Sequence, residues 1–200
     1  MDIKSAGNSD KPSVLVIGVV HGDEPQGKFL IENYLKLNPD TKILFIPCLN
    51  YYGFENKIRV NKNHVDINRN FPTKNWELSD INDYYSGVAP ASEFETRFLI
   101  NLIENNDFKV ILTLHAPYKV VNYDKRNDDD NSCKDLVKKI SEIIKYPICD
   151  DIGYPTPGSF GTWAGLEKNI STITLELDED ADMSILQGPV FKIFKLLEEY

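Results

Sequence analysis

Two residues that can bind a metal ion stand three positions apart in the segment HGDE, at His21 and Glu24. The segment directly follows an apolar, β-branched run at 14–20, and such a run predicts a buried strand. Ligands of open α/β sheets bind at the carboxyl ends of strands, so we expect both side chains at that edge. An imidazole and a carboxylate are two of the three protein ligands of an open zinc site, and the third must come from elsewhere.

The third ligand and a second carboxylate follow two later apolar runs. The run VILTL is followed by His115, and Glu176 lies near the end of the run ISTITLEL. Strand ends of a largely parallel sheet share one edge, where His21, Glu24 and His115 would supply two imidazoles and one carboxylate and leave a position for water. Glu176 need not bind the metal, because a carboxylate there can act as general base toward that water and later as acid toward a leaving amine.

Residues 49–90 show little periodicity, and a loop of this length inside a compact domain is usually functional. Asn68 and Arg69 are adjacent in it, and Arg59 precedes them. A guanidinium group is a planar fork that matches a carboxylate. Asp66 is placed to accept the second ring N–H of a ligand histidine and so to fix its tautomer. The arginines of this segment are therefore suited to binding a carboxylate.

Strand-like and helix-like segments alternate along the chain and must position these residues. The predicted strands cover residues 14–20, 42–47, 110–114 and 170–177. The predicted helices begin near Pro25, Ser92, Ser132 and Met183, and Glu95 is expected to complete a capping box with Ser92. Residues 122–131 are expected to form a charged, solvated loop. The alternation predicts a three-layer α/β fold with a mostly parallel mixed sheet flanked by helices.

Length and composition indicate one ordinary globular unit. We expect a single catalytic domain over residues 1–200, with residues 1–12 as a loosely ordered lead-in. The net charge of −9 and the lack of a basic tail argue against nucleic-acid or anionic-membrane binding. The polar first residues and the absence of an 18-residue apolar run predict a cytoplasmic protein. Three cysteines without a C-x-x-C motif argue against a disulfide framework.

The segments HGDE, DINRNFP, LHAP and TLE, in this order, resemble the zinc metallocarboxypeptidase superfamily. Two further segments, YYSGVAPASEFET (84–96) and IGYPTPGSFGTW (152–163), are similar to its murein peptide amidase branch. Enzymes of that branch cleave the amide between γ-D-glutamate and meso-diaminopimelate in cytoplasmic cell-wall peptides. The resemblance covers roughly residues 14–178. It implies a zinc carboxypeptidase-like fold, one Zn²⁺ per chain, and the release of meso-diaminopimelate from short murein peptides.

The resemblance also implies a role for each candidate residue. By this resemblance, zinc is held by His21, Glu24 and His115, and the free carboxylate of the released residue is bound by Asn68 and Arg69. Arg59 stabilises the oxyanion, and Glu176 acts as the base. Asp66 holds a ligand histidine, and Tyr154 caps the substrate. The larger enzymes carry the oxyanion arginine further upstream, so Arg59 is matched across a deletion. The expected partner is a small peptide with a free carboxylate, and no oligomeric state is predicted.

Two other functions remain open at this point. An N-acyl amino acid deacylase of the aspartoacylase or succinylglutamate desuccinylase kind shares the zinc ligands, the Asn-Arg pair and the glutamate, but PTPGSFGTW favours the murein branch. A zinc-containing peptide-binding protein without turnover would not need Glu176 or Arg59. His64 matches no motif position and is expected to be structural or solvent-facing. Tyr84 is expected to be a packing residue or a cleft wall.

Overall fold

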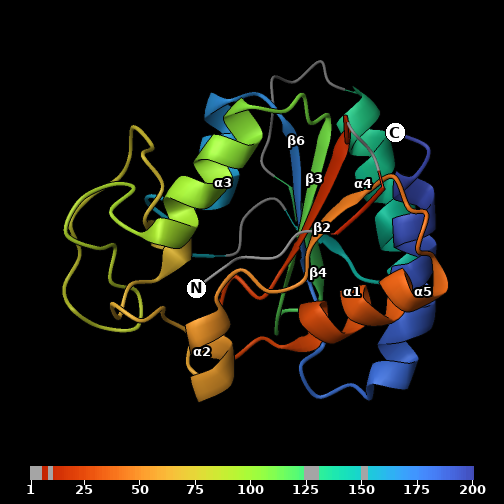
Figure 1. The fold of residues 1–200 in the computed structure, drawn as a ribbon, viewed down its shortest axis with the longest axis horizontal. Helices are drawn as coiled ribbons and strands as arrows, with labels where there is room; N and C mark the ends of the chain where they lie inside the picture. The colour runs from red at the N-terminus through yellow and green to blue at the C-terminus, as the bar shows by residue number, and fades with distance from the viewer. Residues whose placement is uncertain (1–5, 9–10, 124–130, 150–152) are drawn as a thin grey trace.

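The computed structural model describes residues 6–8, 11–123, 131–149 and 153–200. Within them, six strands form one sheet in the order β2-β1-β3-β6-β4-β5 (Figure 1). The strands are β1 (Val14–Gly18), β2 (Leu44–Ile46), β3 (Val110–His115), β4 (Val120–Tyr123), β5 (Ile148–Cys149) and β6 (Ser171–Glu176). Neighbouring strands are parallel except for β4 and β6, which pair antiparallel. The predicted mixed, mostly parallel sheet is confirmed.

Helices cover both faces of the sheet. In Figure 1, α3 lies on one side of the strands, and α1, α4 and α5 lie on the other. The helices are α1 (Gln26–Leu37), α2 (Tyr51–Asn56), α3 (Phe94–Glu104), α4 (Asn131–Ile144) and α5 (Met183–Leu197), with a 3-10 turn η1 (Ile67–Arg69) and a π-helical segment η2 (Thr162–Glu167). The three-layer α/β architecture predicted from the alternating apolar runs is therefore confirmed.

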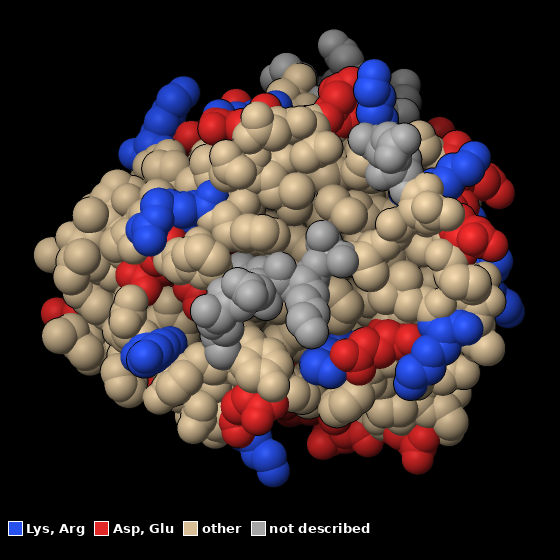
Figure 2. Space-filling model, in the orientation of Figure 1, with Lys and Arg blue, Asp and Glu red and all other residues tan. Residues whose placement is uncertain are grey.

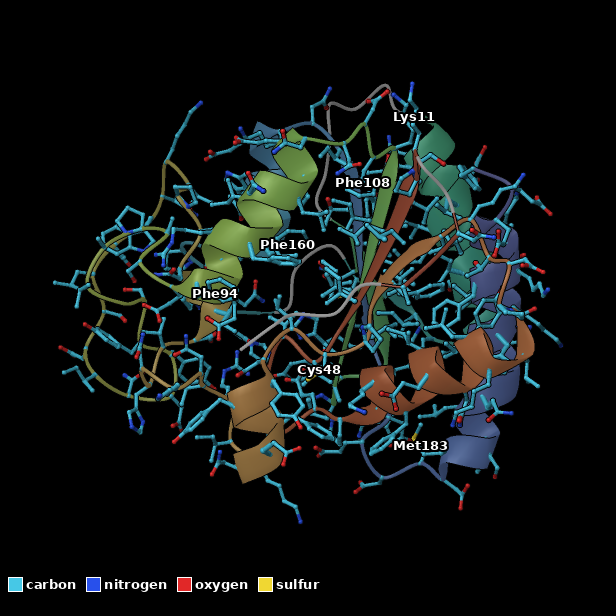
Figure 3. All side chains as sticks on the ribbon, in the orientation of Figure 1. Lys11, Cys48, Phe94, Phe108, Phe160 and Met183 are labelled. Atoms are coloured by element: carbon cyan, nitrogen blue, oxygen red, sulfur yellow. The ribbon has the colours of Figure 1, made fainter. Side chains whose placement is uncertain are left out.

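Each side of the sheet has its own hydrophobic core. One core joins β1, β3 and β6 to α1, α4 and α5 and includes the fully buried Tyr34 and Phe194. The other joins the opposite face to α3 and η2, and Figure 3 shows Phe108 and Phe160 between α3 and the sheet. Because both faces of the central strands are covered, β1 and β3 are apolar at nearly every position.

Two strands of the sheet, β4 and β5, were not predicted from the sequence, because neither is mostly buried. Residues 122 and 123 were expected in a charged loop, but they complete β4, where Asn122 pairs with Thr174 of β6. Only Val121 of this strand is fully buried, so β4 lacks the continuous apolar run that marks a central strand. Residues 124–130 of the expected loop lie outside the described residues.

The predicted capping box at the start of α3 is wrong, although the helix is present. The helix begins at Phe94 rather than Ser92, and its N-cap makes no side-chain hydrogen bond. Ser92 Oγ donates instead to Glu93 Oε1 at 2.6 Å, while Glu95 Oε2 accepts from Asn61 Nδ2 at 3.1 Å. Both side chains are thus engaged in contacts other than the local cap.

Part of the N-terminal lead-in is hydrogen-bonded to the edge of the sheet. Ala6 pairs antiparallel with Phe45 of β2, and the Asn8 backbone N–H donates to the Thr41 carbonyl at 2.8 Å. Residues 1–5 and 9–10 lie outside the described residues, and the single-domain assignment stays a prediction.

The surface is charged without a single dominant sign on the face that Figure 2 draws. Lys and Arg side chains lie interspersed with Asp and Glu side chains there, and the described residues of this face form no continuous basic patch. In the described part of the chain, no helix combines the length and the apolar character needed to cross a bilayer.

Candidate active site

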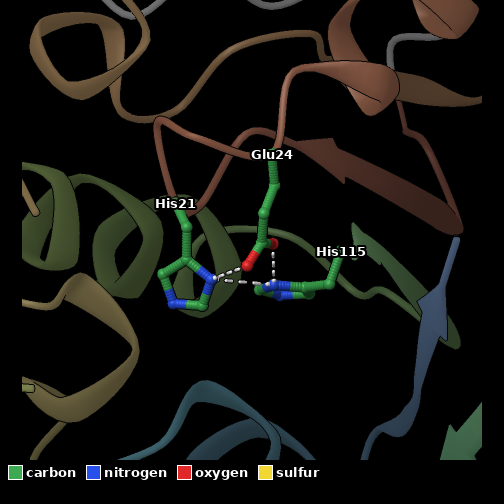
Figure 4. A group of neighbouring side chains, drawn as sticks. All are labelled: His21, Glu24 and His115. Carbon is green, nitrogen blue, oxygen red and sulfur yellow. Dashed lines mark hydrogen bonds and ion pairs between the residues drawn. The ribbon is translucent and has the colours of Figure 1, made fainter. Parts of the chain in front are cut away.

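Three side chains from two neighbouring strand ends converge at one edge of the sheet (Figure 4). His21 and Glu24 follow β1, and His115 is the last residue of β3. Glu24 Oε1 lies 2.8 Å from His21 Nδ1, and Glu24 Oε2 lies 2.9 Å from His115 Nδ1. The two Nδ1 atoms are 3.2 Å apart. The three predicted ligands therefore present their donor atoms to one another, within 4.8 Å in all.

This donor set fits a zinc ion. Two nitrogen ligands held at about 2.0–2.1 Å from one ion at a tetrahedral angle are roughly 3.4 Å apart, close to the separation of the Nδ1 atoms of His21 and His115. On the other side of its ring, His21 Nε2 lies 3.1 Å from Asp66 Oδ1. A hydrogen bond from Nε2–H to that carboxylate leaves Nδ1 free of a proton and available to a metal. Two imidazoles and one carboxylate are also the ligand types that zinc prefers in open sites.

The charges of the cluster are strongly coupled. Burial alone would lower the pKa of His21, but the carboxylates of Glu24 and Asp66 outweigh it and raise that pKa to about 9. Burial likewise works against ionisation of the two carboxyl groups, yet the neighbouring imidazoles hold the pKa of Glu24 well below its usual range. His21 and Arg59 do the same for the pKa of Asp66. The carboxyl groups of Glu24 and Asp66 are thus ionised at neutral pH and carry negative charge beside His21.

The backbone that carries His21 is locked by a close contact between two glycines. A Cβ atom on Gly22 would lie 1.9 Å from the carbonyl carbon of Gly53 in α2, so only glycine fits there. Asn50, the buried N-cap of α2, accepts from Gly53 N at 2.9 Å and donates to the Arg59 carbonyl at 3.0 Å. Gly22 N donates to the same carbonyl at 3.2 Å. The loop that carries His21 and Glu24 is therefore connected to α2 and to Arg59.

Arg59 is held in place by Asp66, and its Nη1 atom points toward Glu24. Its Nε and Nη2 donate to Asp66 Oδ2 at 3.0 and 2.9 Å, while Nη1 lies 3.6 Å from Glu24 Oε1. Burial would lower the pKa of Arg59, but the charges of Asp66 and Glu24 outweigh the effect of burial and raise the pKa above its ordinary value. Asp66 thus orients both His21 and Arg59, and its predicted partnership with His21 agrees with this geometry.

The Asn-Arg pair lies on η1, beside the cluster. Asp66 Oδ1 accepts from the Asn68 backbone N–H at 2.8 Å, and Asn68 Oδ1 accepts from Phe160 N at 2.8 Å. These bonds fix the Asn68 side chain. Arg69 is only 5% exposed, donates from Nη1 to the Asn68 carbonyl at 2.8 Å, and forms no ion pair with any carboxylate of the described chain. A buried guanidinium without an anion is suited to binding a carboxylate from outside.

Glu176 ends β6 directly opposite His115. It is 7% exposed, and its Oε2 atom is buried without a hydrogen-bond partner in the described chain. Burial raises its pKa above the ordinary value of 4.5, although His115 lowers it in part. A carboxyl group in this setting can take up and release a proton beside His21, Glu24 and His115.

A cavity of about 280 Å³ joins these residues. Eight of the nine predicted site residues line it, and the ninth, Asp66, lies behind His21 and Arg59. The eight are His21, Glu24, Arg59, Asn68, Arg69, His115, Tyr154 and Glu176. Tyr154 is 38% exposed. Burial and a hydrogen bond with Tyr118 raise the pKa of Tyr154 to about 12. The structure thus brings the predicted residues together, while their individual roles stay predictions.

Sequence reasoning did not single out the contact that Tyr84 makes. Its ring lies 4.9 Å from the Arg59 guanidinium carbon and 5.8 Å from that of Arg69. Tyr84 also lines the cavity, as expected of a cleft wall. No sequence signal points to the two arginines, because Tyr84 lies in an aperiodic loop. His64 is exposed, in line with its solvent-facing prediction.

Comparisons with known proteins place this geometry in a family. The zinc carboxypeptidase family profile matches residues 1–196. Murein peptide amidase A of Vibrio campbellii is 32% identical over 190 residues, covering 86% of this chain and 72% of the relative. Murein peptide amidase A of Escherichia coli K12 is 28% identical, covering 94% and 81%. The crystal structure of the murein-tripeptide amidase MpaA from Escherichia coli O157 superposes with a TM-score of 0.78 at 25% identity, covering 96% and 83%.

The chain belongs to the zinc carboxypeptidase family and is a peptide hydrolase. The predicted resemblance to this family and to its murein peptide amidase branch is confirmed, as is the zinc carboxypeptidase-like fold.

Proposed function

We propose that this chain is a zinc-dependent amidase that releases meso-diaminopimelate from γ-D-glutamyl–meso-diaminopimelate in short murein peptides. The curated relatives named murein peptide amidase A support the substrate class. One observation carries the chemistry: the Oε2 atom of Glu176, which has no hydrogen-bond partner among the described residues, shares a cavity with His21, Glu24 and His115. A general base beside an open metal site can activate water for the hydrolysis of an amide.

The cofactor proposed is one zinc ion per chain, held by His21, Glu24 and His115. When bound, zinc would act as a Lewis acid that polarises the scissile carbonyl and lowers the pKa of water. Asp66 keeps the His21 ring oriented, because it accepts from Nε2–H on the side that faces away from the other ligands.

The remaining steps use side chains of the cavity. Asn68 and Arg69 hold the free carboxylate beside the scissile amide, and this anchors the substrate. Glu176 removes a proton from the attacking water and delivers it to the departing amine nitrogen. Arg59 Nη1 donates to the oxygen that becomes negative during attack, while Asp66 keeps its guanidinium in place. Tyr154, at the rim, covers the bound residue.

The substrate must overcome an unfavourable overall charge. A murein peptide with free carboxylates is anionic and the chain carries a net charge of −9, so long-range attraction does not assist association. Arg59 and Arg69 therefore have to supply local positive charge. The cytoplasmic location expected from the sequence remains a prediction and suits a substrate recovered from cell-wall turnover.

A direct assay tests the proposal. Zinc-loaded chain is incubated with L-Ala-γ-D-Glu-meso-diaminopimelate, and free diaminopimelate is measured together with the zinc content. We expect release by the wild type and a loss of about 10²–10⁴-fold in Glu176→Gln with zinc retained. Glu104→Gln is the matched control, because Glu104 is half-exposed and, among the described residues, its carboxylate pairs with Lys168 alone, on the surface.

Other outcomes would point elsewhere. Hydrolysis of N-acyl amino acids without cleavage of the murein peptide would mean a deacylase, which the curated relatives do not favour. Zinc and peptide binding without any turnover would mean a binding protein. Full activity in Glu176→Gln would show that Glu176 is not the base.

A further inference from the structure

The loop that runs from Arg59 to Asp66, here called the Arg59–Asp66 loop, is closed both at its ends and in its middle. At the ends, the guanidinium of Arg59 donates twice to the Asp66 carboxylate. In the middle, the Asn61 backbone N–H donates to the Val65 carbonyl at 2.9 Å. Asn61 Oδ1 accepts from the backbone N–H groups of Val65 and Asn63 at 3.0 Å each. Asn61 is 1% exposed, so it forms the buried centre of the loop.

Asn61 also joins this loop to the start of α3. Its Nδ2 atom donates to Glu93 Oε2 at 2.8 Å and to Glu95 Oε2 at 3.1 Å. Asn63 Nδ2 donates to the same Glu93 oxygen at 2.8 Å. With two acceptor and two donor bonds, the Asn61 side chain makes all four hydrogen bonds that an asparagine can make. A buried polar group that is satisfied in this way specifies one arrangement of its neighbours.

Glu93 is itself held from two sides. It is 3% exposed and forms no ion pair within the part of the chain that the structure describes. Ser92 Oγ donates to its Oε1 atom at 2.6 Å, and its backbone N–H donates to Asn70 Oδ1 at 3.1 Å. Asn70 is fully buried and directly follows η1. Because the Glu93 side chain does not cap α3, its carboxylate connects the helix to the Arg59–Asp66 loop instead.

These contacts determine how freely Arg59 can move. The ion pair with Asp66 fixes the guanidinium relative to the carboxylate, while the position of both depends on the loop that carries them. The hydrogen bond from Asn50 to the Arg59 carbonyl holds one end of this loop. The contact between Asn61 and Glu93 holds its middle against α3, a helix that packs on the sheet.

We propose that Asn61 and Glu93 are positioning residues for the reaction, which hold the Arg59–Asp66 loop against α3 and so keep Arg59 Nη1 directed toward the cavity. The inference rests on the proposed function, because it takes Arg59 to stabilise the oxygen that becomes negative during attack. Neither residue lines the cavity, so both act through Arg59. Their effect falls on kcat rather than on KM, since Arg59 acts when charge develops and Arg69 anchors the bound peptide.

An exchange of the two polar groups tests this. Asn61→Asp turns the Nδ2 donor into an acceptor that faces the Glu93 carboxylate, and kcat should fall roughly 10- to 100-fold. Glu93→Gln weakens the contact without reversing it, and should lower kcat about 2- to 10-fold. The double variant Asn61→Asp/Glu93→Gln again pairs a donor with an acceptor at the wild-type net charge, so its kcat should exceed that of Asn61→Asp by at least about threefold. KM should change by less than about threefold in all three variants.

A second readout does not need turnover. The Arg59 Nε–H donates to Asp66, and NMR spectroscopy of the zinc-loaded chain measures how fast this proton exchanges with water. Exchange should be faster in Asn61→Asp and should return toward the wild-type rate in the double variant. The matched control Asn101→Asp/Glu104→Gln makes the same two chemical changes at exposed positions of α3, and it should leave both kcat and the exchange rate unaltered.

The outcomes separate this inference from the proposed function. Wild-type kcat and wild-type exchange of the Arg59 proton in Glu93→Gln, which carries the test even if Asn61→Asp does not fold, would overturn the positioning role. A double variant no better than Asn61→Asp, or a lower free energy of unfolding with unchanged kcat, would overturn it as well. Restored proton exchange in the double variant of a chain that cleaves no murein peptide would support the positioning role and refute the proposed reaction.

Discussion

His115 and Glu176 lie directly opposite each other on the adjacent parallel strands β3 and β6. The sheet register thus fixes the distance between a metal ligand and the proposed base. Two residues earlier, the Oγ1 atoms of Thr113 and Thr174 lie 3.1 Å apart on the same pair of strands. Because these strands are in the centre of the sheet, the positions of both groups are set by the most rigid part of the fold.

The first prediction concerns the energetic cost of the buried base. Burial raises the pKa of Glu176 in the folded chain above 4.5. A carboxyl group with a raised folded-state pKa contributes its full stability below the unfolded-state pKa and loses it as the pH rises through the folded-state pKa. Metal-free Glu176→Gln should therefore be more stable than metal-free wild type at pH 7, and the difference should shrink as the pH falls through the folded-state pKa of Glu176 towards 4.5 and stay small below that pH. Urea unfolding across this pH range measures it.

The control for this measurement is Glu104→Gln, whose carboxylate is half-exposed and should give a small, nearly constant difference. A Glu176→Gln chain that is less stable at pH 7, or a difference independent of pH, would contradict the prediction.

The second prediction concerns Asp66, which is fully buried between His21 and Arg59. Asp66→Asn removes the charge that orients both groups, so zinc affinity should fall about 10–100-fold. The free energy of unfolding should fall by about 2–4 kcal/mol, because the partly buried guanidinium of Arg59 loses its fully buried counter-ion. Competition with a chromophoric chelator and denaturant unfolding measure the two effects. Asp107→Asn, which removes an exposed partner of Lys109, should change neither by a measurable amount.

The sequence pointed to the central sheet and the metal cluster because both depend on local patterns. Apolar runs mark β1, β3 and β6, and the polar residues directly after the apolar runs at 14–20 and 110–114 were enough to suggest His21, Glu24 and His115. Strand ends of a parallel sheet meet at one edge, so proximity followed from topology. The short strands β4 and β5 were missed, because their burial is partial and gives no clear period.

The cavity walls could not be derived in the same way. Tyr84 reaches Arg59 and Arg69 from an aperiodic loop, and only the three-dimensional path of that loop brings them together. The position of Arg59 depends on the contact of Gly22 with Gly53, which no spacing rule reveals. Arg59 was identified through a family resemblance. Its ion pair with Asp66 and its approach to Glu24 became visible only in the structure.

The third prediction concerns Asn50, which caps α2 and holds the Arg59 carbonyl. Asn50→Ala removes both hydrogen bonds at a fully buried position, so the free energy of unfolding should fall by about 2–3 kcal/mol. Since Arg59 would lose a backbone anchor, kcat should fall while KM for the peptide, set by Asn68 and Arg69, changes less. Denaturant unfolding and steady-state kinetics test this.

Asn56→Ala is the matched control for Asn50→Ala. Asn56 lies in the same helix at an exposed position, and its Nδ2 atom donates to the Tyr52 carbonyl and to no other group in the part of the chain that the structure describes. The change should stay within about 0.5 kcal/mol and leave kcat unaltered. Similar effects of both substitutions would mean that the link from Asn50 to Arg59 has no special importance.

The last prediction compares two glycine-to-alanine changes. In Gly22→Ala the new Cβ would lie 1.9 Å from the Gly53 carbonyl carbon, and backbone cannot yield as a flexible side chain can. The metal-binding loop must then move away from α2, so we expect a loss of about 3 kcal/mol or more and weakened zinc binding. In Gly188→Ala, on the exposed face of α5, the new Cβ meets no atom within 4 Å beyond the adjacent residues and the backbone of the helix itself. The gain in helix propensity is offset because Pro189 follows and disfavours a Cβ on a helical residue before it, so stability should change by less than about 1 kcal/mol, with zinc binding unchanged. Thermal unfolding and zinc titration of the pair measure both effects. A Gly22→Ala chain with wild-type stability and zinc affinity would mean that the glycine contact does not hold the ligand loop.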